Sequence, residues 1–170
     1  MGTLRRIQNR LTEAKTELET AIALDRNDPS ASNQLGVTLM FMGKPEAGIP
    51  HIERAIRLSP HDPVIAPYYS GLGACHLLLG HANEAIDLLK KARSANPRLW
   101  FIHLWLAGAL GLRDDLDEAR VALAEGIRLK PDVNSVAGYR AQFPRTNPQY
   151  SALSANTIET GLHRAGMPEE

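Results

Sequence analysis

The stretch that decides the fold runs from Leu35 to Pro60 and reads LGVTLMFMGKPEAGIPHIERAIRLSP. Two later stretches align with it without an internal gap: LGACHLLLGHANEAIDLLKKARSANP at 72–97 and LAGALGLRDDLDEARVALAEGIRLKP at 106–131. The closing proline recurs after 37 residues and then after 34, and we assign the three extra residues to an insertion at 63–65. A fixed period of this length predicts stacked structural repeats.

The aligned stretches carry small residues at corresponding places. Glycine inside a helix costs about 1 kcal/mol relative to alanine, so the glycines at these places need the gain of a close helix–helix approach. Gly43 and Gly80 stand between two helical patterns, where glycine favours a left-handed turn, and Asp114 takes that place in the last stretch. The closing proline ends the second helix, because proline cannot continue the hydrogen-bond ladder. The small-residue positions are Gly36, Gly73 and Ala107, then Gly48, Ala85 and Ala119, then Ala55, Ala92 and Gly126.

This period and pattern resemble the tetratricopeptide repeat, whose unit is a pair of antiparallel helices. The resemblance covers residues 1–131 and implies an all-α fold, a right-handed α/α superhelix or solenoid with C-terminal capping helices. We expect the solenoid domain at 1–133 and the capping helices at 134–170. The expected units are a partial one at 1–28 and complete ones at 29–62, 66–99 and 100–133.

The first unit is incomplete. Its second helix fits residues 11–24, but only residues 3–8 remain for its first helix. Either that helix is short, or the chain is a piece of a longer protein; the lack of a polar capping element at the start favours the second alternative. With a truncated first helix, we expect Leu11, Leu18 and Ile22 to be poorly covered, which predicts self-association through the N-terminal edge.

Two shorter helical patterns follow the last repeat. Asn134 or Ser135 can cap the first of them, which stops before Pro144. Asn147 caps the second, with Pro148 at its first helical position. We expect this second helix to lie as a cap over the open edge of the fourth unit, because it has one apolar face. The residues of that face are Tyr150, Leu153, Thr157, Ile158, Gly161, Leu162 and Ala165.

The tail of the chain also resembles the ending of a group of proteobacterial tetratricopeptide proteins, many of which carry an adenylate or guanylate cyclase domain. No metal-binding or base-recognition motif of the cyclase is matched, so the resemblance implies no catalysis here. It implies an alternative function, a regulatory or oligomerisation segment of a cyclase or similar bacterial signalling protein. The matching residues are Phe143, Pro144, Gly161, Leu162, Ala165, Gly166 and Pro168.

Composition narrows the classes of function. The chain has 170 residues with 19 basic and 19 acidic side chains, so its net charge gives no attraction to nucleic acid or an anionic membrane. Cys75 is the only cysteine, which excludes an intrachain disulfide and, with no signal peptide in the sequence, predicts a cytoplasmic protein. The most apolar run, 99–112, is interrupted by His103 and is shorter than the roughly 18 residues that span a bilayer.

The sequence offers no pattern for catalysis, cofactor binding or metal binding. The six histidines are dispersed, and no pair has the helical spacing of a metal site with a matching carboxylate. Cys75 and His76 are neighbours on a helix, so their side chains point in different directions and cannot act as nucleophile and base. No glycine-rich phosphate loop follows a strand pattern. We therefore expect no catalytic, cofactor or metal site and no enzyme.

The family resemblance implies a concave groove lined by the first helices of successive pairs. By register, the groove residues are Asn33, Val37, Met40, Phe41, Ser70, Ala74, Leu77, Leu78, Phe101, Leu104, Gly108 and Leu112. This set is largely apolar, with an adaptable methionine, and favours an apolar helix or extended segment as ligand. It lacks the lysine and asparagine arrangement with which co-chaperones hold a C-terminal carboxylate. The expected function is a non-enzymatic protein-interaction scaffold, whose groove is either open or covered by the C-terminal helix.

Overall fold

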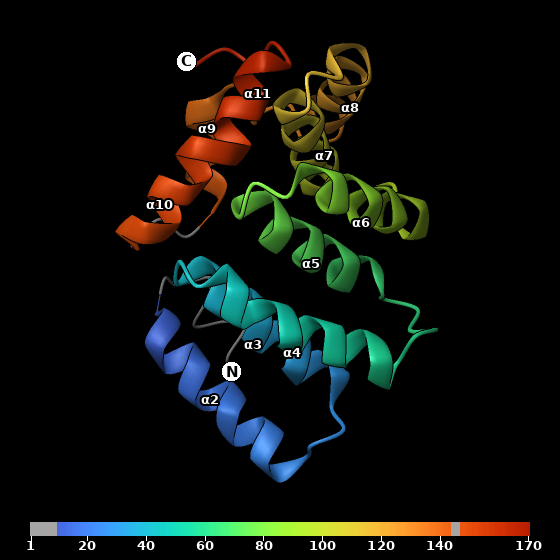
Figure 1. Cartoon of the computed structure of the whole chain (residues 1–170), viewed down its shortest axis with the longest axis vertical. Coiled ribbons are helices and arrows are strands. Elements are labelled where there is room, and N and C mark those ends of the chain that lie inside the picture. Colours follow the sequence, from blue (N-terminus) through green and yellow to red (C-terminus); the bar gives the residue numbers. More distant parts are fainter. Residues whose placement is uncertain (1–9, 144–146) are drawn as a thin grey trace.

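The computed structural model describes residues 10–143 and 147–170, and within these ranges the regular elements are all helices (Figure 1). The expected all-α architecture is confirmed. The short first helix expected at 3–8 and the stop at Pro144 lie outside the described residues. The helices of the repeats are α2 (Leu11–Leu24), α3 (Pro29–Phe41), α4 (Pro45–Leu58), α5 (Ala66–Leu78), α6 (Ala82–Ala95), α7 (Trp100–Leu112) and α8 (Leu116–Leu129).

Helices α3 and α4, α5 and α6, and α7 and α8 form successive pairs, and the pairs stack through α4 on α5 and α6 on α7. Within a pair the turn is left-handed: φ is 74° at Gly43, 78° at Gly80 and 64° at Asp114. The glycine turns expected from the sequence are thus confirmed. Asp114 adopts the same conformation without being glycine, since aspartate is among the residues that tolerate it best.

The small residues of the repeat allow the helices of a pair to touch. A β-carbon added to Gly48 would lie 2.5 Å from the carbonyl oxygen of Gly36, and one added to Gly36 would lie 2.6 Å from that of Gly48. In the last pair, a β-carbon on Gly126 would lie 2.6 Å from Leu104 Cδ2. These contacts provide the packing that offsets the helix-breaking tendency of glycine.

The N-terminal edge differs from the expectation. Leu11 and Leu18 are buried and Ile22 is half-buried, so the prediction that these side chains are poorly covered is wrong for the first two. The reason is that α2 packs against the rest of the solenoid. Leu18 forms a small apolar cluster with Leu35 and Leu39 of α3, and Leu11 belongs to the main core. Self-association through this edge stays a prediction.

The remaining helices are α9 (Val136–Gln142), α10 (Pro148–Ser154), the π-helix η1 (Ala155–Glu159) and α11 (Thr160–Arg164). Their expected caps are confirmed: Gly138 N donates to Ser135 Oγ at 3.1 Å, and Tyr150 N donates to Asn147 Oδ1 at 3.0 Å. We call residues 147–170 the C-terminal segment. It does not cover the last unit alone, because it runs beside α7, α5 and the end of α3 (Figure 1).

Candidate functional site

The inner face is the surface formed by the first helices of the pairs, α3, α5 and α7, and it carries the groove residues expected from the sequence. Val37, Phe101 and Leu112 are half-buried there. The others are buried beneath neighbouring helices and the C-terminal segment: Asn33, Met40, Phe41, Ser70, Ala74, Leu77, Leu78, Leu104 and Gly108. Two of them contact the C-terminal segment: Phe41 meets Tyr150, and Gly108 lies against Ile158. Whether these residues contact a ligand stays a prediction.

The C-terminal segment begins at the end of α3. A β-carbon on Gly43 would lie 2.5 Å from Gln149 Cβ and 2.9 Å from both Asn147 Oδ1 and Tyr150 N. Beside this turn, the rings of Phe41 and Tyr150 meet edge to face with their centroids 5.0 Å apart. The first turn of α10 is therefore seated on the turn between α3 and α4.

The segment continues past α5, which η1 contacts, to α7, where three glycines meet. A β-carbon on Gly161 would collide with the carbonyl oxygen of Gly108, and one on Gly111 would collide with that of Gly161. A β-carbon on Gly108 would lie 3.1 Å from the carbonyl oxygen of Ile158. Helices α7 and α11 thus touch backbone to backbone, and only glycine fits at the crossing.

An aromatic cluster joins α3, α7, α9 and α10. Phe143 lies at its centre, with ring centroids 4.9 Å from Tyr139, 5.6 Å from Trp105 and 5.7 Å from Trp100. Trp105 Nε1 donates a hydrogen bond to the Tyr139 hydroxyl at 3.1 Å. Aromatic pairs at such separations add about 0.5–1.5 kcal/mol each beyond the area that they bury. The cluster consists of Phe41, Trp100, Phe101, Trp105, Tyr139, Phe143 and Tyr150.

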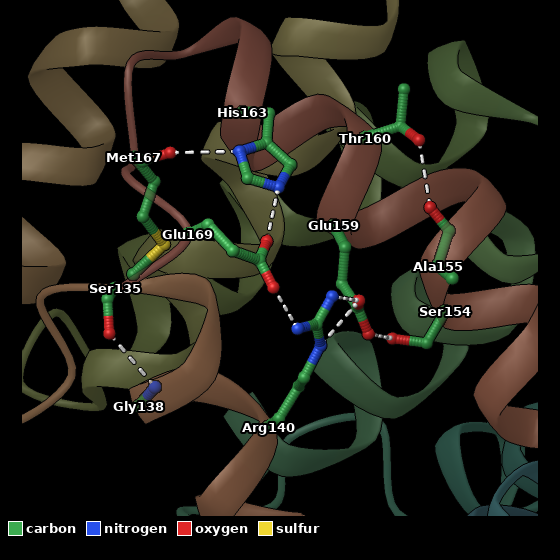
Figure 2. Close-up of polar contacts among 10 residues, drawn as sticks. All are labelled: Ser135, Gly138, Arg140, Ser154, Ala155, Glu159, Thr160, His163, Met167 and Glu169. Carbon is green, nitrogen blue, oxygen red and sulfur yellow. Dashed lines mark hydrogen bonds and ion pairs between the residues drawn. The ribbon is translucent and has the colours of Figure 1, made fainter.

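A buried carboxylate fixes the middle of the segment (Figure 2). The Glu159 side chain is only 2% exposed, and its Oε2 accepts hydrogen bonds from Arg140 Nε at 2.9 Å and Nη2 at 2.8 Å. Its Oε1 accepts from Ser154 Oγ at 2.9 Å. Both carboxylate oxygens are therefore satisfied, as a buried charge requires.

Sequence reasoning missed Arg140 and Glu159. Glu159 lies in the π-helix η1, where it is buried beside Ile158. A helical period is read from apolar residues, so a charged residue beside the apolar face is expected to point to solvent. A π-turn inside a helix is rare and often occurs at functional sites, but the sequence carries no reliable signal for it.

The last residues of the chain return to α9. Val136 N and Ala137 N donate to the carbonyl oxygens of Pro168 and Glu169, each at 2.9 Å, and so the tail satisfies the first amides of that helix. The Glu169 carboxylate pairs with Arg140 and lies 2.9 Å from His163 Nε2 (Figure 2). The hydrogen bond from Arg140 is the main reason that the pKa of Glu169 lies below its ordinary value.

Cys75, for which the sequence predicted no catalytic role, is fully buried in the core. Burial raises the pKa of its thiol to about 12, so the thiol is protonated at neutral pH. Burial, and then the charge of His81, lowers the pKa of His76. In the described ranges, no three His, Cys, Asp or Glu side chains gather closely enough to hold a metal ion. The described helices include none that is long and apolar enough to cross a membrane.

Comparison with known proteins agrees with the repeat pattern. Residues 28–98 match the model of a tetratricopeptide repeat family. No curated protein matches the chain. The matches give no support to the resemblance between the tail and cyclase-linked proteins.

Three solved structures share the fold. A crystal structure of MamA has a TM-score of 0.65 and 20% identity, with 96% of this chain and 94% of that chain covered. MamA residues 41 to the end, from Desulfovibrio magneticus RS-1, give a TM-score of 0.66 and 16% identity over 96% and 85% of the two chains. A chain in the crystal structure of the APC/C hetero-tetramer Cut9-Hcn1 has a TM-score of 0.73 and 20% identity. The match covers 97% of this chain and 28% of that chain. The protein therefore has the all-α, right-handed superhelical fold of tetratricopeptide proteins, and its residues 28–98 match that family directly.

Proposed function

We propose that this chain is a non-enzymatic scaffold that binds a peptide or helix of another protein on its inner face. The fold and the family match both suggest a protein-interaction scaffold. The observation that carries the finer proposal is that the inner face already holds a helical segment, with the side chains of Tyr150, Ile158 and Leu162 buried against it. A surface that accommodates one amphipathic helix has the shape and chemistry to accept another.

The chemistry of the inner face supports an apolar ligand. Met40, Leu77 and Leu78 are fully buried there, and none of the expected groove residues is charged. Methionine is flexible and polarisable, so Met40 can adapt to ligands of different shape. Val37 and Phe101 remain half-buried and offer the first points of contact for an incoming chain.

Photo-crosslinking in the source cells tests this proposal. A benzoylphenylalanine residue is placed at Val37 or at Phe101, with Val121 on α8 as the control position because it is 69% exposed. We expect a specific adduct with another protein from positions 37 and 101 only. The purified partner should then bind the unmodified chain in calorimetry. Adducts that form equally well at position 121, or none with a second protein at 37 and 101, would contradict the proposal.

A further inference from the structure

We propose that the outer face of α8 binds a second copy of this chain, with the two α8 helices antiparallel about a two-fold axis. The outer face is the side of α8 opposite to its buried residues. It consists of Asp117, Arg120, Val121, Ala124, Glu125 and Arg128. This surface is separate from the inner face, so the inference goes beyond the proposed function.

The outer face is open to solvent. Helix α8 packs against α7, and the buried residues of α8 are Ala119, Ala122, Leu123 and Gly126. With 3.6 residues per turn, residues 117, 121, 124 and 128 lie on the opposite side of the helix. In Figure 1, α8 lies at the edge of the molecule, where a second chain has room to approach. Val121, near the middle of this side, is 69% exposed.

The centre of the outer face is apolar where earlier repeats carry charges. The alignment of the repeats places Val121 at the position of Asp87 in α6, and Ala124 at the position of Lys90. The counterpart of Ala124 in α4 is also charged, since it is Glu53. A single exposed apolar side chain needs no explanation by itself, but this one lies within a symmetric pattern of charges.

The charged residues of the outer face alternate in sign along α8. Asp117, Arg120, Glu125 and Arg128 follow one another at steps of three, five and three residues. Two antiparallel copies therefore place Asp117 of one copy opposite Arg128 of the other, and Arg120 opposite Glu125. Residue 121 then lies opposite residue 124. A parallel two-fold pair would instead bring each charge against its own copy, so the face is complementary to itself in the antiparallel orientation.

In a single copy these charges pair along the helix. Arg120 Nη1 lies 3.2 Å from Asp117 Oδ1, and Arg128 Nη2 lies 2.7 Å from Glu125 Oε1. Exposed pairs of this kind add little stability, and a second copy gives each group a further partner. We therefore expect the charges to set the orientation and the salt dependence of the dimer, while the apolar centre contributes to its affinity.

The dimer should be weak. One pair of 14-residue helices buries less than the roughly 1,200–2,000 Å² of a stable protein interface. Association should therefore depend on protein concentration, and it should weaken as added salt screens the charges. A two-fold dimer presents two inner faces to a partner, a consequence that rests on the proposed function.

Sedimentation of charge-reversed variants tests the inference. An acidic variant carries Arg120→Glu and Arg128→Glu, and a basic variant carries Asp117→Lys and Glu125→Lys. Two copies of either variant repel each other in any orientation of the paired helices. At low salt, we expect each variant alone to self-associate at least about tenfold more weakly than the unmodified chain. An equimolar mixture of the two should restore a dimer that contains one copy of each.

The control variant combines Arg57→Glu on α4 with Lys91→Glu on α6. Both side chains are exposed, and the net charge changes as much as in the acidic variant. This variant should self-associate like the unmodified chain. An unmodified chain that stays monomeric at high concentration and low salt would overturn the inference. So would a mixture of the acidic and basic variants that does not associate, or a control variant that loses association to the same extent.

The orientation is tested with a spin label on Asp132→Cys, just beyond the end of α8. Cys75 is fully buried and does not take the label. Amide signals are recorded from a second, unlabelled copy that is enriched in nitrogen-15. We expect broadening near residues 113–117 of that copy. Broadening near residues 128–132 would indicate a parallel pair, and broadening in α2 would indicate contact through the N-terminal edge; either would overturn the inference.

Photo-crosslinking separates the inference from the proposed function. Benzoylphenylalanine at position 121 should give an adduct of two copies of this chain, whereas positions 37 and 101 should give adducts with another protein. An adduct of two copies at position 121, without adducts at positions 37 and 101, would leave the dimer standing and remove the scaffold function. The reverse result would leave the scaffold function standing and remove the dimer.

Discussion

The backbone of Gly161 in α11 lies directly against the carbonyl group of Gly108 in α7, with no room for a β-carbon between them. Even the methyl group of an alanine at position 161 should therefore disturb this contact. We expect Gly161→Ala to destabilise the chain by about 1–3 kcal/mol through overpacking, despite the roughly 1 kcal/mol by which alanine favours a helix. Thermal melting measures the loss. Ala152→Leu is the control for added bulk, and a Gly161→Ala chain that melts like the parent would show that the two helices do not touch.

In the pair of Arg140 and Glu159, the carboxylate is buried and the guanidinium side chain is 36% exposed. Arg140→Ala leaves the Glu159 carboxylate with the hydrogen bond from Ser154 but without its main partner. Because water reaches part of Arg140, we expect a cost of about 1–3 kcal/mol, less than for a fully buried pair. Replacing both residues by leucine removes the unpaired charge and should cost less than Arg140→Ala alone. A double-mutant cycle in chemical denaturation measures the coupling between the two positions. Additive effects would indicate that the pair is not formed in solution.

The tail should be sensitive to acid. The pKa of Glu169 is lowered, chiefly by its hydrogen bond from Arg140, so its contribution is present above the ordinary value of 4.5 and is lost as the pH falls through the lower folded value. Since Glu169 is exposed, we expect the effect to be local. Amide exchange at Val136 and Ala137, whose N–H groups bond the tail, should accelerate with acidification beyond the intrinsic pH dependence. Glu169→Gln should remove that excess, and an unchanged profile would contradict the role of the carboxylate.

Deleting the C-terminal segment should lower the melting temperature but leave a helical solenoid. The lost burial of Tyr150, Ile158 and Leu162 is worth about 1.5–3 kcal/mol for each side chain before ordering entropy is subtracted. Each kcal/mol corresponds to about 2–4 °C for a chain of this size. Hydrogen exchange should rise first in α7, which contacts η1 and α11, and later in α8. A truncated chain with unchanged exchange in α7 would show that the segment does not lie on this helix in solution.

The sequence predicted the helix pairs because their signals are local and periodic. Gly43 and Gly80 mark turns by their own conformational freedom, and the cap at Asn147 depends on residues a few positions away. The placement of the C-terminal segment was not predictable in the same way. An apolar stripe shows that a helix is covered but not which surface covers it.

The pairing of Arg140 with Glu159 was also beyond the sequence pattern. Arg140 lies in α9 and Glu159 in η1, and a charged residue carries no apolar signal that would predict its burial. The glycine at position 161 was expected on the covered face, yet its closest neighbour could not be named, because residues 108 and 161 are far apart in the chain. Long-range contacts of this kind depend on how the helices pack, and they produce no periodic pattern in the sequence.

The aromatic cluster gives the chain an optical property of its own. Trp100 and Trp105 are its only tryptophans, and both lie within 6 Å of the Phe143 ring by their centroids, 5.7 Å and 5.6 Å respectively. The tryptophan emission of the molecule therefore originates where α9 meets α7. Any rearrangement that exposes this junction to water should shift the emission maximum to longer wavelength. Unfolding confined to α2 should leave the wavelength of the emission maximum unchanged.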